Sequence, residues 1–267
     1  MRDFSGVLLA TDLDGTLLAK GHTLPPGSAA AVSRFMEAGG RFTLATGRSL
    51  MGLACVRPLV AVNAPAVVLN GAIVYDYETE TLLHGQPLSP EARALAGLIR
   101  GRFPDIGMEI MTLREKYAVC RNDQINMHLT YVQCTAADIP APGDAPGDWY
   151  KLLAVDTPQR LKPVGEWLEA EFGDRIHACY SSPILLEIQD RGVDKGAGVA
   201  RVAEIIGARQ VYCAGDNGND LPMMRAFPSF APANATDECK AAALAVGPDC
   251  RDDFMAFVIA EIEKRQT

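Results

Sequence analysis

The sequence predicts an α/β fold with a doubly wound parallel sheet, interrupted by an inserted α+β domain. Short apolar runs alternate with stretches of helical periodicity at both ends of the chain, which is typical of βαβ units. Between them, residues 77–187 show more alternation of apolar and polar positions, which favours antiparallel strands. We therefore expect residues 1–76 and 188–267 to form one core and residues 77–187 to form the insert.

The N-terminal part begins with a continuous apolar run, Val7–Ala10, which suits a central strand covered on both faces. Apolar residues then recur at helical spacing until Gly39 and Gly40 end the pattern. The predicted elements are strand 5–11, helix 26–38, strand 41–45, a second helix after Ser49, and strand 66–69, which Asn70 and Gly71 close.

The insert begins after a polar, hairpin-like turn at 76–80 and contains a Pro/Gly/Asp-rich surface loop at 138–148. Its predicted elements are helix 89–102, strands 106–112, 116–120 and 150–155, helix 158–172, and strands 175–180 and 184–188. The βα alternation then resumes with helix 195–206, strand 210–214, a short helix to 226, strand 229–231, helix 236–243, strand 245–246 and helix 253–264.

The composition is that of an ordinary soluble globular protein, with 48% hydrophobic and 22% charged residues. A net charge of −8 disfavours nucleic-acid binding, although a local site for a phosphorylated ligand remains compatible with it. There is no signal-peptide pattern and no apolar run of membrane-spanning length. The seven cysteines include no CxxC pair, which favours reduced thiols in the cytoplasm over a zinc site or a disulfide framework. The oligomeric state is not indicated.

Four segments place polar groups directly after a predicted parallel strand or at the start of a helix. They are Asp12/Asp14, Thr46-Gly47-Arg48, Lys195, and Gly215-Asp216-Asn217-Gly218-Asn219-Asp220. The carboxyl ends of the strands in a doubly wound sheet converge in one crevice, so we expect these segments to meet.

Together the four segments fit phosphoryl transfer. A carboxylate such as Asp12 can act as a nucleophile, and Asp14 can serve as general acid and base. Thr46 offers a hydroxyl group for the phosphate, and Lys195 offers a positive charge. Asp216 adds a carboxylate for Mg²⁺, which is commonly held by one or two carboxylates and the phosphate. An anion beside three carboxylates would be repelled without such a cation.

Each segment taken alone also has a structural explanation. Asp-x-Asp after a strand suits a turn, Thr46 suits a helix N-cap, and single charges such as Arg48 suit the solvated surface. Asn70-Gly71 is a turn signal by default. The order and spacing of the whole set on a βα framework favour the chemical interpretation.

The set resembles the four ordered motifs of the haloacid dehalogenase (HAD) superfamily, and the insert resembles the large α+β cap domain of its Cof-type sugar-phosphatase branch. Asn70-Gly71-Ala72, Leu186-Glu187-Ile188 and Gly192-Val193-Asp194-Lys195-Gly196 also match that branch. The resemblance implies a Rossmann-like HAD core, a Mg²⁺ cofactor, and hydrolysis of a small phosphorylated metabolite through an aspartyl-phosphate.

The resemblance also assigns roles to individual residues. Asp12 matches the nucleophile and a magnesium ligand, Asp14 the acid/base and a ligand through its backbone carbonyl, and Asp216 the further ligand. The predicted phosphate or substrate contacts are Leu13, Thr46, Gly47, Arg48, Lys195 and Asn219, and Asp220 is predicted to lie in the second shell of the metal.

Two other activities remain open on these residues. A phosphomutase-type transfer would use the same Asp12/Asp14 pair. A phosphorylation-dependent receiver module is less favoured, because its phosphoacceptor follows the third strand, where Asn70-Gly71 stands here. A HAD scaffold that only binds partners has no support, since all motif residues are present. Polar residues of the insert are predicted to lie on its surface and are candidate specificity groups: Glu109, Arg114, Arg121, Asn126, His128 and Tyr131.

Overall fold

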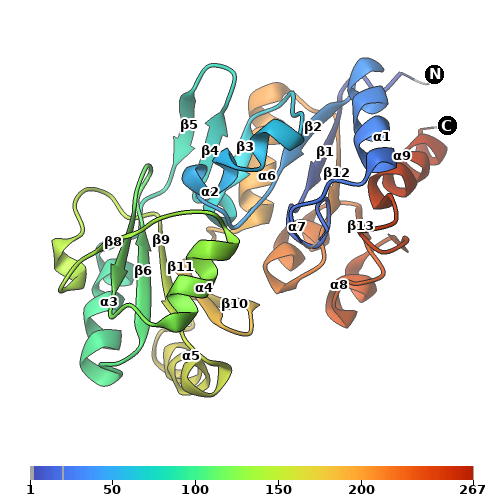
Figure 1. The fold of residues 1–267 in the computed structure, drawn as a ribbon. Helices are drawn as coiled ribbons and strands as arrows, with labels where there is room; N and C mark the ends of the chain where they lie inside the picture. Colours follow the sequence, from blue (N-terminus) through green and yellow to red (C-terminus); the bar gives the residue numbers. More distant parts are fainter. Residues whose placement is uncertain (1–2, 20, 267) are drawn as a thin grey trace. The chain divides into compact units, whose positions relative to one another are not determined.

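The computed structural model describes residues 3–19 and 21–266, and these fall into two compact units. The first comprises residues 1–47, 56–84 and 194–267, and the second comprises residues 48–55 and 85–193. Each unit has its own sheet and its own apolar core (Figure 1).

The first unit is built on a five-stranded parallel sheet with the order β14-β13-β12-β1-β2. The strand β1 (Val7–Thr11) is completely buried and lies between β12 (Gln210–Ala214) and β2 (Arg41–Leu44). The outer strands are β13 (Ser229–Ala231) and β14 (Ala245–Val246). A parallel sheet brings the C-terminal ends of β1 and β12 to the same edge, as their register shows by pairing Thr11 with Ala214.

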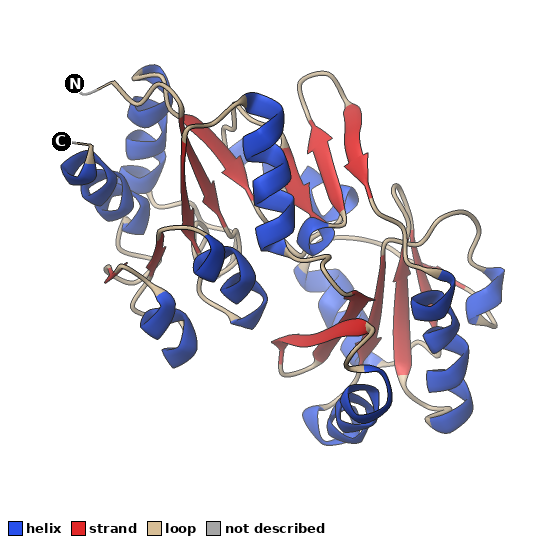
Figure 2. Cartoon of the chain, turned by 180° about the vertical axis from the view of Figure 1, so that it is seen from behind, coloured by secondary structure: helices blue, strands red, loops and turns tan. Residues whose placement is uncertain are grey.

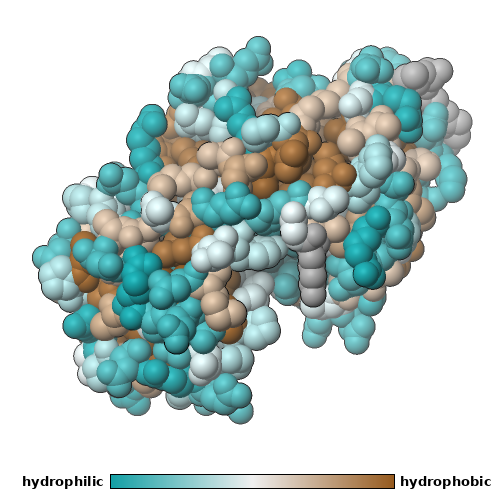
Figure 3. Space-filling model, viewed as in Figure 1, coloured by the Kyte–Doolittle hydropathy of each residue, from teal (hydrophilic) through white to brown (hydrophobic). Residues whose placement is uncertain are grey.

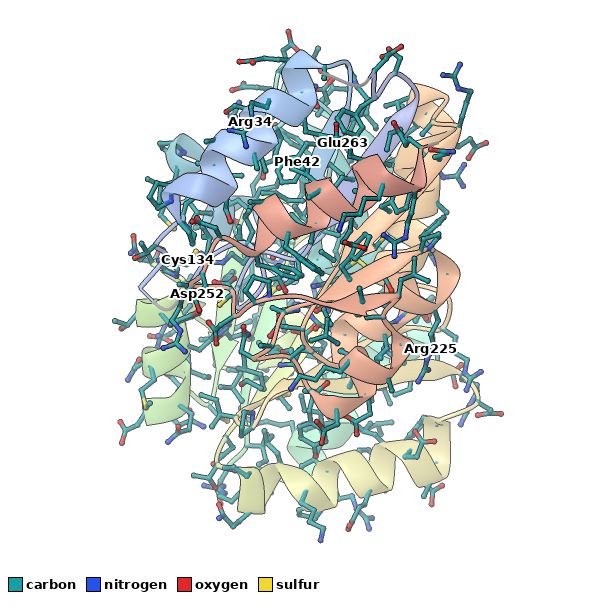
Figure 4. The ribbon with its side chains drawn as sticks, turned by 90° about the vertical axis from the view of Figure 1, so that its right-hand side faces the viewer. Arg34, Phe42, Cys134, Arg225, Asp252 and Glu263 are labelled. Atoms are coloured by element: carbon teal, nitrogen blue, oxygen red, sulfur yellow. The ribbon has the colours of Figure 1, made fainter. Side chains whose placement is uncertain are left out.

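Helices cover both faces of this sheet. On one face, α1 (Pro26–Glu37) packs against α9 (Phe254–Arg265), and Figure 4 shows Phe42 of β2 close to these two helices. On the other face lie α6 (Lys195–Ile206), α7 (Leu221–Ala226) and α8 (Asp237–Ala242), with α6 and α7 in front of the sheet in Figure 2. The predicted doubly wound α/β core is therefore confirmed.

A second, three-stranded sheet belongs to the same unit, with the antiparallel order β3-β4-β5. Its strands are β3 (Ala66–Val68), β4 (Ile73–Asp76) and β5 (Thr81–Gly85), and a parallel bridge from Ala45 to Val67 joins β3 to the end of β2. The predicted polar turn at 76–80 connects β4 and β5. Because this hairpin pairs with β3, the boundary with the second unit falls after residue 84 rather than after residue 76.

The second unit is built on a six-stranded sheet with the order β10-β11-β9-β6-β7-β8. All neighbours are antiparallel except β7 and β8. The strands are β6 (Gly107–Met111), β7 (Lys116–Val119), β8 (Ala137–Asp138), β9 (Lys151–Val155), β10 (Ile176–Ser182) and β11 (Leu185–Asp190). Asp190, at the end of β11, pairs with Ile176, which places the second boundary after residue 193 rather than after residue 187.

Alternation along these strands separates an apolar face from a polar one. Side chains such as Met108, Leu152 and Ile188 form a core with α3 (Pro90–Arg102) and α5 (Pro158–Phe172). Their neighbours in sequence, such as Glu109 and Lys151, point to the opposite face. The short α2 (Leu50–Ala54) also belongs to this unit, and so does the helix α4 (Asp123–Tyr131). The sequence did not predict α4.

Across the two units, single 3₁₀ turns lie at η1 (Arg57–Leu59), η2 (Leu69–Gly71), η3 (Pro142–Asp144) and η4 (Gly218–Asp220).

Hydrophobic side chains are visible over the part of the first unit that contains β1, β2 and α1 (Figure 3). The same unit also contains a hollow of about 90 Å³ beside Val32 and Phe42. Among residues 3–19 and 21–266, no helix is both long enough and apolar enough to cross a membrane.

Candidate active site

Asp12 directly follows β1, which has a partner strand on each side. Its backbone N–H donates to the carbonyl of Ala214 at 2.8 Å, which continues the β1–β12 ladder by one residue. The residue is 7% exposed. A carboxylate is thus fixed at the carboxyl edge of the sheet, where the sequence predicted it.

Lys195 is the first residue of α6, and its side chain is fully buried. The preceding residue, Asp194, caps the helix by accepting from the backbone N–H of Ala197 at 2.9 Å. The Lys195 Nζ atom lies 2.5 Å from Asp12 Oδ1 and 2.6 Å from Asp220 Oδ1. Three residues that are far apart in the sequence therefore meet through one ammonium group.

The loop after β12 carries two more carboxylates. Asp220 Oδ2 accepts from the backbone N–H groups of Asp216 and Asn217, at 2.8 and 3.0 Å, so both oxygens of Asp220 are engaged by protein donors. Asp216 Oδ1 accepts from the Thr16 hydroxyl at 2.7 Å. One oxygen each of Asp12, Asp216 and Asp220 lie within 4.8 Å of one another.

Crowding and burial shift the proton affinities of these groups. Burial raises the pKa of Asp12 well above its usual range, and the neighbouring carboxylates add to this although Lys195 opposes it. Burial and Asp220 also raise the pKa of Asp216, to about 7. Burial alone would lower the pKa of Lys195, but Asp12 and Asp220 raise it above its ordinary value. One buried ammonium thus faces an excess of carboxylates.

This donor set fits a hard divalent cation, because carboxylate oxygens are the ligands that such ions prefer. The backbone is shaped for close approach: Gly15 has φ +93°, and a Cβ atom there would lie 2.6 Å from Asp216 Oδ2. The sequence named Asp12, Asp14 and Asp216 as ligands, whereas the third carboxylate of the cluster is that of Asp220. The backbone role of Asp14 stays a prediction.

Asp14 lies two residues beyond Asp12, and its side chain is 26% exposed. The His22 Nε2 atom lies 3.9 Å from Asp14 Oδ1. Nothing in the sequence pointed to His22, because it stands in a loop outside every motif. The sequence could have indicated Thr16, because this residue lies only two positions after Asp14. Asn234, which donates to the Gly15 carbonyl at 2.8 Å, had no signal either.

Thr46 is buried beside the same sheet, and its backbone N–H donates to the carbonyl of Val67 at 2.9 Å. Gly47 is the last residue of its segment to belong to the first unit. The Leu13 side chain is fully buried in the apolar interior, so only its backbone can reach a ligand. Asn219 donates through Nδ2 to Asn70 Oδ1 at 3.2 Å.

Arg48 belongs to the second unit. Its Nη1 atom donates to the Gly52 carbonyl at 2.8 Å, and its guanidinium group lies 5.9 Å from the centre of the Tyr131 ring. The side chain is buried rather than solvated. These contacts attach Arg48 to α2 and α4, and its predicted contact with phosphate or substrate stays a prediction.

Two of the predicted surface residues of the insert are buried instead. His128 Nδ1 lies 2.7 Å from Glu109 Oε1, and Lys116 Nζ lies 3.6 Å from Glu109 Oε2. Lys151 Nζ lies 3.2 Å from Glu187 Oε2 on the same polar face. These charges are buried because they pair across strands and with α4. The remaining four are at least partly exposed: Arg114, Arg121, Asn126 and Tyr131.

The family model of the haloacid dehalogenase-like hydrolases matches residues 9–259, nearly the whole chain. The chain belongs to the haloacid dehalogenase-like hydrolases. Within this superfamily it is a Cof-type hydrolase, so the predicted family and enzyme class are confirmed.

Curated relatives of this HAD-like hydrolase are named as phosphatases. The pyridoxal phosphate phosphatase YbhA of Escherichia coli is 28% identical, and the alignment covers 96% of this chain and 98% of that protein. An HMP-PP phosphatase of Klebsiella pneumoniae is also 28% identical, and the alignment covers 94% of each chain. The structure resembles that of a haloacid dehalogenase-like hydrolase from Bacillus subtilis, with a TM-score of 0.85, 20% identity, and coverage of 96% of this chain and 99% of that one.

Proposed function

We propose that this HAD-like hydrolase is a Mg²⁺-dependent phosphatase that hydrolyses a small phosphorylated metabolite through an aspartyl-phosphate on Asp12. The observation that carries the proposal is the buried ammonium of Lys195 between Asp12 and Asp220, at 2.5 and 2.6 Å. Such an arrangement holds one carboxylate at a strand end and leaves a positive charge beside it for a phosphoryl group.

Asp12 and Asp216 would hold the Mg²⁺ ion, together with the backbone carbonyl of Asp14. Asp220 would stabilise these ligands without coordinating the ion itself, because both of its oxygens already accept hydrogen bonds from protein donors. When bound, the cation supplies positive charge that offsets the repulsion between the carboxylates and the phosphate and stabilises the charge of the transferring group. Side chains of the protein carry out the nucleophilic attack and the proton transfers.

In the first step, the free Asp12 carboxylate oxygen attacks the phosphorus atom. The bond from phosphorus to the leaving oxygen breaks, and Asp14 donates its proton to that oxygen. In the second step, Asp14 takes a proton from water as the water oxygen attacks the phosphorus. The bond from phosphorus to Asp12 breaks, inorganic phosphate leaves, and both carboxyl groups return to their starting states.

The remaining predicted residues bind the phosphate. Lys195 supplies charge, and Thr46 supplies its hydroxyl group. The backbone of Leu13 and Gly47 can contribute polar groups, and Asn219 an amide. We propose that Arg48 also contacts the phosphate or the substrate.

We propose that the second unit selects the substrate. The substrates named for relatives guide the choice of compounds to test: pyridoxal phosphate for one and HMP-PP for another. Sugar phosphates complete the panel, because the fold matches that of a HAD subclass IIB sugar phosphatase with a TM-score of 0.82.

We propose a cytoplasmic location. All seven cysteines are free thiols, which supports a reducing compartment.

The test is release of inorganic phosphate from this panel, with Mg²⁺ and with EDTA. We expect release with Mg²⁺ only, and its loss in Asp12→Asn. Asp252→Asn, which changes an exposed carboxylate of the same unit, is the control and should match the wild type. An isomerised product without free phosphate would indicate a phosphomutase, and no release from any compound would contradict a phosphatase.

A further inference from the structure

The loop after β3 has an unusual backbone. Leu69, Asn70 and Gly71 follow one another with φ values of +50°, +53° and +99°. Side chains other than glycine rarely adopt this left-handed region, and a branched residue such as leucine does so only when its surroundings impose it. All three residues are buried. The loop is therefore held by its neighbours.

Those neighbours are the segments that carry the proposed phosphate-binding groups. The backbone N–H of Asn70 donates to the Thr46 carbonyl at 3.0 Å. The Asn70 Oδ1 atom accepts from Asn219 Nδ2 at 3.2 Å. Gly71 lies so close to the residue before Lys195 that a Cβ atom at this glycine would stand 2.0 Å from the Asp194 carbonyl oxygen.

A simple Asn-Gly turn between β3 and β4 does not require these three contacts. It could form with the asparagine side chain toward solvent. Here the asparagine is 4% exposed and its amide oxygen is aimed at Asn219, which comes from the loop after β12. The default interpretation of Asn70-Gly71 as a simple turn is thus incomplete.

We propose that Asn70 is a positioning residue of the phosphatase: its amide oxygen orients the Asn219 carboxamide toward the substrate's phosphate. This inference rests on the proposed function. By accepting a hydrogen bond from Asn219 Nδ2, Asn70 fixes the rotation of the Asn219 side chain. The Asn219 amide is then already in position when each substrate binds. Asn70 itself touches no reacting atom.

The test is a double-mutant cycle between Asn70→Gly and Asn219→Ala, with p-nitrophenyl phosphate as substrate and orthovanadate as inhibitor. Glycine adopts the left-handed conformation without strain, so the fold should keep its thermal midpoint while the amide is lost. Removing one neutral hydrogen bond predicts a kcat/KM about three- to tenfold lower, and weaker vanadate inhibition by a similar factor. In the Asn219→Ala background, Asn70→Gly should have no further effect.

Asn70→Asp serves as a second variant if glycine loosens the loop. Aspartate tolerates the left-handed region and keeps an acceptor oxygen. We expect Asn219→Ala to reduce kcat/KM by the same factor in the wild type and in the Asn70→Asp background, and by less in the Asn70→Gly background.

Two results would contradict the inference while the wild type is active: Asn70→Gly with wild-type kcat/KM, or losses that multiply in the double variant. Multiplying losses would mean that Asn70 acts independently of Asn219. A wild type that releases no phosphate with Mg²⁺ would instead contradict the proposed function, and the inference would fall with it.

Discussion

Lys195→Met tests how much the buried ammonium contributes to the fold. The Lys195 side chain has no exposure, and its Nζ atom lies 2.5 and 2.6 Å from two carboxylates. Methionine has a similar length and no charge, so it leaves Asp12 and Asp220 without their cation. Removing one partner of a buried ion pair typically costs about 3–5 kcal/mol. We expect the free energy of unfolding to fall by that amount.

The assay is equilibrium unfolding in urea at neutral pH with EDTA, followed by circular dichroism, because both tryptophans lie in the second unit and do not report on the first. The matched control is Lys162→Met, because that lysine is 75% exposed and lies 3.9 Å from Glu166 on the helix surface. An exposed pair of this kind contributes about 0.5 kcal/mol or less. Equal midpoints for the two variants would refute the claim that the ammonium compensates buried charge.

Two further predictions concern other parts of the chain. Burial alone would raise the pKa of Glu109, but His128 and two lysines lower it below 4.5, so the stabilising contribution of this carboxylate is present above pH 4.5 and is lost as the pH falls through the folded-state pKa. Glu109→Gln should therefore lower the free energy of unfolding by about 1.5–3 kcal/mol at pH 7 and by progressively less in acid. Urea unfolding across pH measures this difference, and a difference that stays constant with pH would contradict the prediction. Gly15→Ala places a Cβ atom 2.6 Å from Asp216 Oδ2, so it should lower kcat by about 100-fold and abolish the Mg²⁺ binding that calorimetry measures. The control is Gly101→Ala, whose added Cβ atom meets nothing within 4 Å. It should leave kcat and Mg²⁺ binding unchanged.

The sequence predicted the elements whose signals are local. The apolar run of β1 and the helical spacing of α1 and α5 correspond to fully or half-buried faces, so their patterns survive in the structure. The helix α4 was missed because few of its residues are buried and apolar, with Ile125 and Leu129 its main ones. Amphipathic periodicity is too weak there to distinguish a helix from a loop.

Pairings across elements were beyond the sequence. Glu109 and His128 are polar, so composition places them on the surface, yet each is buried because the other supplies its partner. The left-handed backbone of Leu69 is similar, since leucine does not favour that conformation and only tertiary contacts impose it. Such features depend on which segments meet, and a single chain pattern does not contain that information.

The site shows the same division. Asp12, Lys195 and Asp216 were predicted from their places after strands or at a helix start, and topology alone brings such positions to one edge. The engagement of both Asp220 oxygens required the actual loop conformation. Arg48, predicted from its place beside Thr46, contacts α2 and Tyr131, and its contact with phosphate or substrate stays a prediction.

The central claim is that Asp12 carries the phosphoryl group during turnover. Acid quenching of the enzyme during turnover with Mg²⁺ and substrate, followed by peptide mass spectrometry, tests it most directly. The peptide that contains Asp12 should gain the mass of one phosphoryl group in the wild type and none in Asp12→Asn, which should not turn over. A phosphoryl group on another residue, or steady phosphate release by Asp12→Asn, would contradict the account.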